Sequence, residues 1–507
     1  MVYLIKTTIT GLLLSTVFAV SESFPDVMNA PKWYCGVALL LVVGFLYVIS
    51  SLFMLGKDAK ANYLQFTENA ACTVCGLQAL LFLLQTTEAV HKYGEFSAGS
   101  FGNVAGLASC LCLSLPLGWL SAKAGNAVYK TFFYLSKTLC LSAVLLSGSR
   151  TGIFCALLVM AFILLPKIRK PLIFVSPILL LVAIFCFKTG SSRGRWFILQ
   201  RTVEMIAQHP FFGWGRGGFE AHYMDVQADF FLQYPDSEYA LLADNIRHPL
   251  NEFLNIAVSY GIVGLLVIAV FVALTVRHAL LHRTETTVTS LSLLLVLGMF
   301  SMFSYPFSYP FTWLMTGFVL ICIYHDRLQL FKKKISCCLI VILPVVGVQL
   351  ADRCCRSLEL RKIQDRASYG LSRRMLPSYA SLYPYMKDDF RFLYSYAFTL
   401  YEAGNAVDAL GMEKECNVLL ADYDLSLLMG DTYRALGQRD STLHYYGRAH
   451  EMCPSRLIPQ YEMFRVYREA NDTVRCLQLR KEILRKPIKV KSRETDDMLE
   501  EIRGYFP

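Results

Sequence analysis

The chain has 507 residues, of which 55% are hydrophobic and 17% are charged, and its mean hydropathy is +0.42. A soluble globular protein has about 25% charged residues, so this composition excludes a wholly soluble protein. Much of the net charge of +10 lies in short segments between apolar runs, where positive charge sets membrane orientation and does not indicate nucleic-acid binding.

The apolar runs fill residues 1 to about 350, and residues 351–507 have the composition of a soluble domain. A helix needs about 20 mainly apolar residues to cross a bilayer. The sequence predicts eleven spans, at 5–20, 34–55, 69–86, 98–120, 128–147, 151–166, 171–187, 252–276, 287–304, 308–324 and 335–350. Ser-Glu-Ser at 21–23 is a poor signal-peptide cleavage site, so we expect the first span to be retained.

Positive charge in the short loops predicts the orientation of these spans. Every second loop is rich in lysine or arginine, namely those with Lys57 and Lys60, Lys123 and Lys130, Lys167 to Lys170, Arg277 and Arg283, and Arg327 to Lys334. These loops belong on the cytoplasmic side, together with the N-terminus. The long segment 188–251 and the domain 351–507 are then expected outside the cytoplasm.

Most of the cysteines lie inside apolar segments. Cys72 and Cys75 form a CxxC pair, but no second pair follows at metal-binding spacing. Cysteine in such a place behaves as a small buried hydrophobe, so we expect no metal site.

The C-terminal domain repeats with a period near 34 residues. Tyr433 to Gly437 and Tyr467 to Asn471 are 34 residues apart, and Gly404 precedes Gly437 by 33. A period of this length with Tyr and Gly in phase is typical of tetratricopeptide repeats, in which each helix pair buries its apolar face on its neighbours. An irregular helical bundle is the alternative.

The segment 188–251 carries an unusual number of arginines. The candidates for binding a ligand are Arg193, Arg195, Arg201, Arg216 and Arg247, with Arg150 at the same membrane face. Guanidinium groups bind phosphate oxygens in a bidentate fork, so several of them together suit a diphosphate at the lipid headgroups. Interfacial anchoring is the alternative for any single arginine.

A glycine-rich stretch and a histidine accompany these arginines. Gly213 and Gly215 lie in His-Pro-Phe-Phe-Gly-Trp-Gly-Arg-Gly-Gly at 209–218 and permit close approach of the backbone to a ligand. His248 could take a proton from a hydroxyl. Pro249 favours the first turn of a helix, which would place Asn251 on the same face as His248. A helix cap is the alternative role for this histidine.

The order of these motifs resembles the O-antigen ligase superfamily, which includes Wzy-type polymerases and bacterial O-oligosaccharyltransferases. The resemblance rests on Ser147 to Thr151, Gly194-Arg195, His209-Pro210, Gly213 and Gly215, the pair His248 and Asn251, and Gly261 to Gly264. It implies an all-α bundle of 11–12 membrane helices in the bacterial inner membrane. The C-terminal repeats would lie in the periplasm.

The resemblance also implies a metal-independent glycosyltransferase without a cofactor. Its donor would be a glycan on undecaprenyl diphosphate, and its acceptor a glycan, lipid A-core or protein hydroxyl. Arg150 and Arg195 would bind the diphosphate, and His248 would activate the acceptor. The family commonly has adjacent His and Asn, whereas Leu250 precedes Asn251 here, so His222 is the second candidate for the base.

Three alternatives to a ligase stay open on the sequence. A polymerase would use the same motifs. A transporter or flippase would need ionisable residues within its spans, of which the sequence shows Lys137 and little else. A scaffold that presents the repeats to a protein partner would leave the arginine-rich segment without a role.

Overall fold

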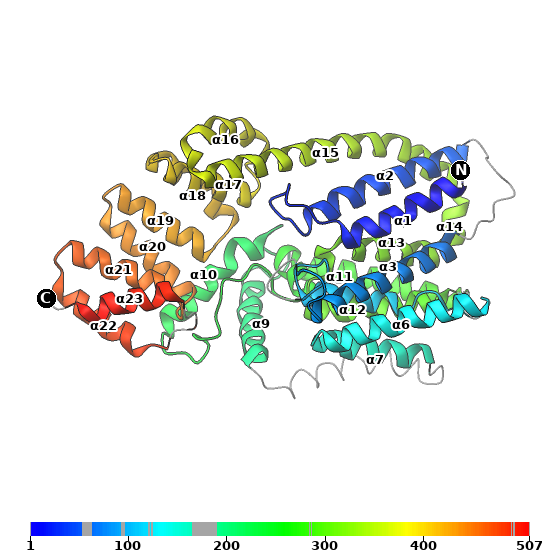
Figure 1. Ribbon diagram of the computed structural model, residues 1–507, viewed down its shortest axis with the longest axis horizontal. Coiled ribbons are helices and arrows are strands. Elements are labelled where there is room, and N and C mark those ends of the chain that lie inside the picture. The colour runs from blue at the N-terminus through cyan, green and yellow to red at the C-terminus, as the bar shows by residue number, and fades with distance from the viewer. Residues whose placement is uncertain are drawn as a thin grey trace. The chain divides into compact units, whose positions relative to one another are not determined.

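The computed structural model describes residues 2–52, 63–92, 97–119, 122, 125–164, 190–282, 284, 286–487, 489 and 492–505. Within these residues the secondary structure is helical, with no strand, which confirms the predicted all-α class. Contacts divide the chain into two compact units. Figure 1 labels the helices of both.

The first unit comprises Met1–Ala183, Leu250–Glu252 and Ile268–Arg361. Its helices are α1 (Val2–Phe18), α2 (Ala30–Leu52), α3 (Tyr63–Thr86), α4 (Val104–Ser114), α6 (Ala127–Leu146), α7 (Arg150–Leu164), the second part of α11 (Glu252–Leu281), α12 (Thr287–Phe303), η2 (Pro306–Ser308), α13 (Pro310–Ile323), α14 (His325–Leu330) and most of α15 (Lys332–Arg366). The predicted span 171–187 lies outside the described residues.

Several of these helices could span a membrane. In the part of the chain that the structure describes, four helical segments are long and apolar enough, namely Ala30–Ser51, Tyr63–Thr86, Glu252–Leu281 and Lys332–Met386. Helices α1, α4, α7, α12 and α13 are apolar but shorter.

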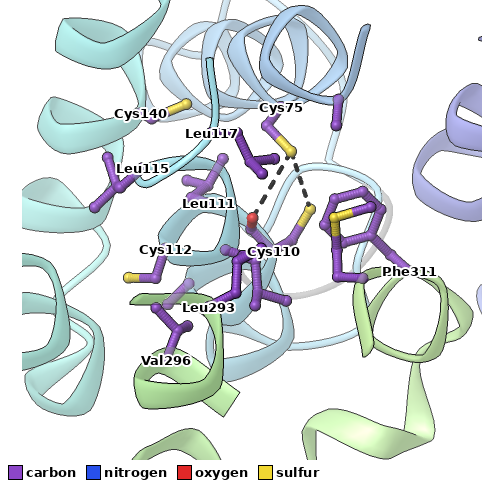
Figure 2. Packing of buried hydrophobic residues seen from close by; sticks show 14 of the residues in the cluster. Cys75, Cys110, Leu111, Cys112, Leu115, Leu117, Cys140, Leu293, Val296 and Phe311 are labelled. Atoms are coloured by element: carbon purple, nitrogen blue, oxygen red, sulfur yellow. Dashed lines mark hydrogen bonds between the residues drawn. The ribbon is translucent and has the colours of Figure 1, made fainter. Parts of the chain in front are cut away.

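The core of this unit packs around α4 (Figure 2). Cys75 of α3 faces Cys110 of α4, with 3.8 Å between their Sγ atoms, and Leu111, Leu293 and Phe311 pack around them. Cys72 and Cys75 are free and buried, so the interpretation of this pair as small core hydrophobes is confirmed.

Helix α4 is much shorter than the span predicted at 98–120, since it ends at Ser114. Two residues later Pro116 interrupts the pattern, and Gly118 adopts a left-handed φ of 77°. The ammonium of Lys137 donates to the Ser114 carbonyl, and the carboxylate of Glu68 accepts from the Gly118 amide at 3.1 Å. Both buried charges therefore serve backbone groups that the early end of α4 leaves unpaired.

The second unit comprises Ile184–Pro249, Phe253–Val267 and Lys362–Pro507. It begins with α9 (Gly190–Gln208) and α10 (Gly218–Gln233) and includes the first part of α11 (Glu252–Leu281). Its C-terminal helices are η3 (Ala367–Leu371), α16 (Ser372–Met386), α17 (Phe390–Glu402), α18 (Ala406–Leu419), α19 (Tyr423–Ala435), α20 (Arg439–Met452), α21 (Ile458–Glu469), α22 (Thr473–Arg485) and α23 (Arg493–Gly504).

Three successive helix pairs follow the predicted period: α17 with α18, α19 with α20, and α21 with α22 (Figure 1). The turns within these pairs contain Gly404, Gly437 and Asn471, and all three residues have a left-handed φ between 55° and 83°. Glycine and asparagine tolerate this conformation best. The 33–34-residue spacing therefore marks equivalent turns, while the assignment to the tetratricopeptide class stays a prediction.

Candidate functional site

Helix α11 is broken at Gly261, where φ is 65° and ψ is −162°. A break of this kind leaves the carbonyls before it and the amides after it without partners inside the helix. The short first part, Glu252 to Tyr260, and the longer second part each need polar partners at the break.

The glycine-rich loop 209–217, between α9 and α10, supplies these partners. The amides of Trp214 and Gly215 donate to the carbonyls of Val258 and Ser259 at 2.7 and 3.0 Å. In the opposite direction, the amides of Ile262 and Val263 donate to the carbonyls of Pro210 and Phe211 at 2.8 and 3.3 Å. We call this set of four backbone hydrogen bonds the clasp.

Two glycines make the clasp sterically possible. A Cβ atom on Gly213 would lie 2.4 Å from the Val258 carbonyl oxygen, and one on Gly261 would lie 2.1 Å from the Phe211 carbonyl oxygen. Both residues also have a left-handed φ, of 69° and 65°. Gly213 was predicted to approach a ligand, but here its open side meets the backbone of α11. A Cβ on Gly215 would meet nothing within 4 Å.

The ring of Trp214 packs against two histidines, His209 of the same loop and His222 of α10. Its ring lies 4.1 Å from that of His209 and 4.4 Å from that of His222, centroid to centroid, and its indole nitrogen donates to the Met205 carbonyl at 2.9 Å. Burial lowers the pKa of His222; nearby Asp225 raises it and His209 lowers it further. A histidine with a lowered pKa is neutral at physiological pH and can accept a proton.

The sequence context predicted that His248 lies at the start of a helix, and this prediction was wrong. Residues 248–251 are not helical, and α11 begins only at Glu252. Leu250 adopts a left-handed φ of 55°, which turns the chain between His248 and Asn251. The helical spacing argument for this pair was therefore wrong, because the turn and not a helix relates the two side chains.

Asn251 and Glu252 hold this turn within the first unit. The Asn251 side-chain amide donates to the Met302 carbonyl at 2.9 Å. The Glu252 carboxylate accepts from the Phe307 amide at 3.2 Å. The contact of Asn251 with Met302 positions the chain. The sequence predicted only a role in substrate binding for this residue.

Three of the predicted binding arginines have acidic partners within the second unit. Arg193 pairs with Glu238, and Arg201 pairs with Glu204 at 2.9 Å while its guanidinium lies 4.2 Å from the Phe230 ring centroid. The third, Arg247, binds Asp422. A guanidinium neutralised by a carboxylate has less charge to offer a diphosphate.

Arg150, Arg195 and Arg216 are the other three predicted binding arginines. Arg150 is the first residue of α7 in the first unit, Arg195 lies on α9 in the second unit, and all three side chains are exposed. Arg216 forms no ion pair with a described residue. Since Arg150 and Arg195 belong to different units, their convergence on one diphosphate stays a prediction.

We call residues 234–251, between α10 and α11, the loop segment. Asp422 anchors the end of this segment to the C-terminal helices. Its carboxylate is fully buried and accepts from Arg247 at 2.8 Å and from the Asn245 side chain at 3.0 Å. As the N-cap of α19, it also accepts from the backbone amides of Asp424 and Leu425.

A second ionic contact lies beside this one. The carboxylate of Asp244 accepts from Arg456 at 2.6 Å and from Lys489 at 3.3 Å. Burial raises the pKa of Asp244, but these cations and the backbone amide of Asn245 lower it. The net result is a pKa below the ordinary value. The chain before His248 is thus fixed at Asp244, Asn245 and Arg247.

Helix α10 packs directly on α20. Arg448 donates to Asp225 at 2.8 Å and to Asp229 at 2.6 Å, and the Gln227 side chain donates to the Met452 carbonyl at 2.7 Å. Sequence reasoning missed these partners, as it missed Asp422. They are more than 170 residues apart in the chain, and no local pattern pairs them.

Comparison with known families bears on this region. Residues 135–269 match the family model described as O-antigen ligase. This segment is similar to the O-antigen ligase family. The match supports a membrane glycan ligase or polymerase type of role. The matched segment includes Arg150, Arg195, loop 209–217, His248 and the break in α11. A search of curated proteins finds no match.

Replacing either glycine of the clasp should destabilise the O-antigen ligase segment. We expect Gly213→Ala and Gly261→Ala each to cost several kcal/mol, because each adds a backbone clash to a left-handed φ. The measurement is the fraction of detergent-solubilised protein that survives heating, followed by size-exclusion chromatography. Gly215→Ala, which meets no atom, should cost less, and Gly298→Ala, in open space on α12, should cost nothing. Equal behaviour of Gly213→Ala and Gly298→Ala would contradict the role of the clasp.

Removing Arg247 should loosen the loop segment from α19. Arg247→Ala leaves the buried Asp422 carboxylate without its cation, which should cost about 1–3 kcal/mol. The measurement is the rate of proteolytic cleavage within 234–251 in membranes. Arg193→Ala, which breaks a more exposed pair, is the matched control and should change little. The effect of Arg247→Ala should shrink in an Asp422→Asn background, and an undiminished effect would show that the pair is not its cause.

Proposed function

We propose that this chain transfers a glycan from an undecaprenyl-diphosphate carrier to an acceptor hydroxyl on the periplasmic side of the bacterial inner membrane. The observation that carries the proposal is the match of residues 135–269 to the O-antigen ligase family. That segment includes Arg150 and Arg195, which are both exposed, together with His248.

The proposed reaction is a direct displacement. The acceptor oxygen attacks the anomeric carbon, the bond from that carbon to the diphosphate oxygen breaks, and the electron pair leaves with the diphosphate. The hydroxyl proton passes to a base of the protein. Fixed guanidinium groups would stabilise the charge that develops on the leaving group, so the proposed step needs no metal.

The ion pairs of the second unit support a division of labour among the arginines. Arg193, Arg201 and Arg247 are paired with carboxylates, which favours a structural role for them. The resemblance to the O-antigen ligase superfamily, and not the state of their pairing, selects Arg150 and Arg195 as the residues that would bind the diphosphate. Arg216, exposed beside the open face of Gly215, is an additional candidate.

Two histidines compete for the role of base. His248 lies in the turn before α11, in the segment that Asp422 and Asp244 anchor, and we propose that it takes the acceptor proton. His222 is the second candidate, since its lowered pKa keeps it neutral. Its ring is engaged with Trp214, however, which favours a packing role.

The helix pairs of the second unit support a role on the acceptor side. Within the second unit, α10 contacts Arg448 of α20, and the segment 244–247 contacts Asp422 at the start of α19 and Arg456 between α20 and α21. We propose that these pairs brace the loop and present a glycan, lipid A-core or protein acceptor, or a protein partner. A Wzy-type polymerase would use the same arrangement with a lipid-linked glycan as acceptor.

Transport of a lipid-linked glycan is the alternative function. Transporters place ionisable residues within their spans, and the first unit buries Lys137 and also Glu68, which the predicted span 69–86 did not include. Each of them, however, binds a backbone group at the end of α4. That structural use favours a transferase over a transporter.

Removing Arg150 or Arg195 should strongly slow glycan transfer. We expect Arg150→Ala and Arg195→Ala each to lower the rate of transfer by about 10²–10³-fold, as loss of a group that stabilises a developing anion does. The measurement is glycan transfer in membranes that contain the lipid-linked donor, normalised to the amount of chain. Arg193→Ala is the matched control and should retain activity within a few-fold. Full activity of Arg150→Ala or Arg195→Ala would contradict the mechanism.

A further inference from the structure

The tip of loop 209–217 exposes two adjacent aromatic side chains. Phe211 and Phe212 are 66% and 77% exposed, although the backbone of Phe211 is hydrogen-bonded to Val263. Beside them on α11, Tyr260, Ile262 and Val263 are also exposed. Adjacent exposed apolar side chains of this size mark a surface that contacts something other than water. We call these five residues the aromatic tip.

The position of the break along α11 indicates what that contact is. After the break, the apolar run Ile262 to Val276 ends at Arg277. At 1.5 Å per residue this run covers about 22 Å, which is less than the hydrocarbon thickness of about 30 Å. The apolar span must therefore continue past Gly261, so the break lies within the hydrocarbon and not outside it.

Irregular backbone at that depth requires complete hydrogen bonding, because water is not there to supply it. The clasp meets this requirement for the carbonyls of Val258 and Ser259 and the amides of Ile262 and Val263. The same bonds satisfy polar groups of the loop. What the loop then presents outward at this level is the pair of phenylalanine rings.

We propose that the aromatic tip inserts into the acyl chains of the bilayer leaflet away from Arg277. The occupant is membrane lipid because the tip lies beside the start of the apolar run of α11, where Leu266 and Val267 of the second unit are also exposed. Arg216 and His209 are exposed and lie on either side of the phenylalanines in sequence, which suits the headgroup level. This inference does not depend on the glycan chemistry.

Photocrosslinking tests the insertion directly. p-Benzoylphenylalanine in place of Phe212 is irradiated in full-length protein reconstituted into phosphatidylethanolamine and phosphatidylglycerol vesicles, and the tip peptide is analysed by mass spectrometry. We expect the mass of one phospholipid on that peptide. The same residue in place of Leu232, which is 63% exposed on α10, is the matched control and should give no lipid adduct. A tip peptide without lipid, or joined to another protein, overturns the proposal.

A second measurement covers failure of the photoreactive variant to fold. Phe212→Trp is a mild change at an exposed position, and its fluorescence beyond that of the parent chain is measured in vesicles of acyl-brominated lipid. We expect this added fluorescence to fall at least two-fold relative to unbrominated vesicles. Added fluorescence that is unchanged by bromination, but quenched by aqueous iodide, overturns the insertion.

Discussion

The organisation of the second unit depends on the break in α11 and the four backbone hydrogen bonds that close it. A helix interrupted in an apolar segment exposes two carbonyls and two amides, and loop 209–217 pairs with all four. The loop and α11 depend on each other, because the carbonyls of Pro210 and Phe211 accept from the amides of Ile262 and Val263. Gly213 and Gly261 are the residues that let the two backbones approach closely enough.

The distribution of charge follows from the same arrangement. Within the second unit, Arg247 binds Asp422 at the start of α19, and Asp244 binds Arg456 between α20 and α21. The arginines engaged in such pairs stabilise the unit. Those on α7 and α9 that the proposed function needs, Arg150 and Arg195, lie at exposed positions. Their role in binding the diphosphate stays a proposal, whereas the ion pairs of Arg193, Arg201 and Arg247 are contacts of the structure.

The sequence predicted the local features well. Apolar runs located the helices, the spacing of Gly404 and Gly437 located equivalent turns, and the motif order agreed with the family match at 135–269. It failed where long-range partners decide the outcome. The sequence analysis did not recognise that Pro116 and Gly118 end α4. The backbone groups at this buried end bind Lys137 and Glu68, which lie on other helices.

The candidate site shows the same limit. The sequence selected the arginines, but the ion pair of Arg247 with Asp422 joins positions 175 residues apart and cannot be inferred from spacing. The glycines at 213 and 215 were predicted as one ligand-binding feature. The structure separates them, because the Cβ position of Gly213 is filled by α11 and that of Gly215 is open.

Hydrogen exchange of the membrane-embedded protein tests the clasp most directly. Deuterium uptake is followed by mass spectrometry in overlapping peptides that cover loop 209–217 and the break at 258–263. The clasp predicts that the amides of Trp214, Gly215, Ile262 and Val263 exchange as slowly as those within α10, and that Gly261→Ala speeds up exchange in both segments together. Rapid exchange of these four amides in the unmodified chain would contradict the account.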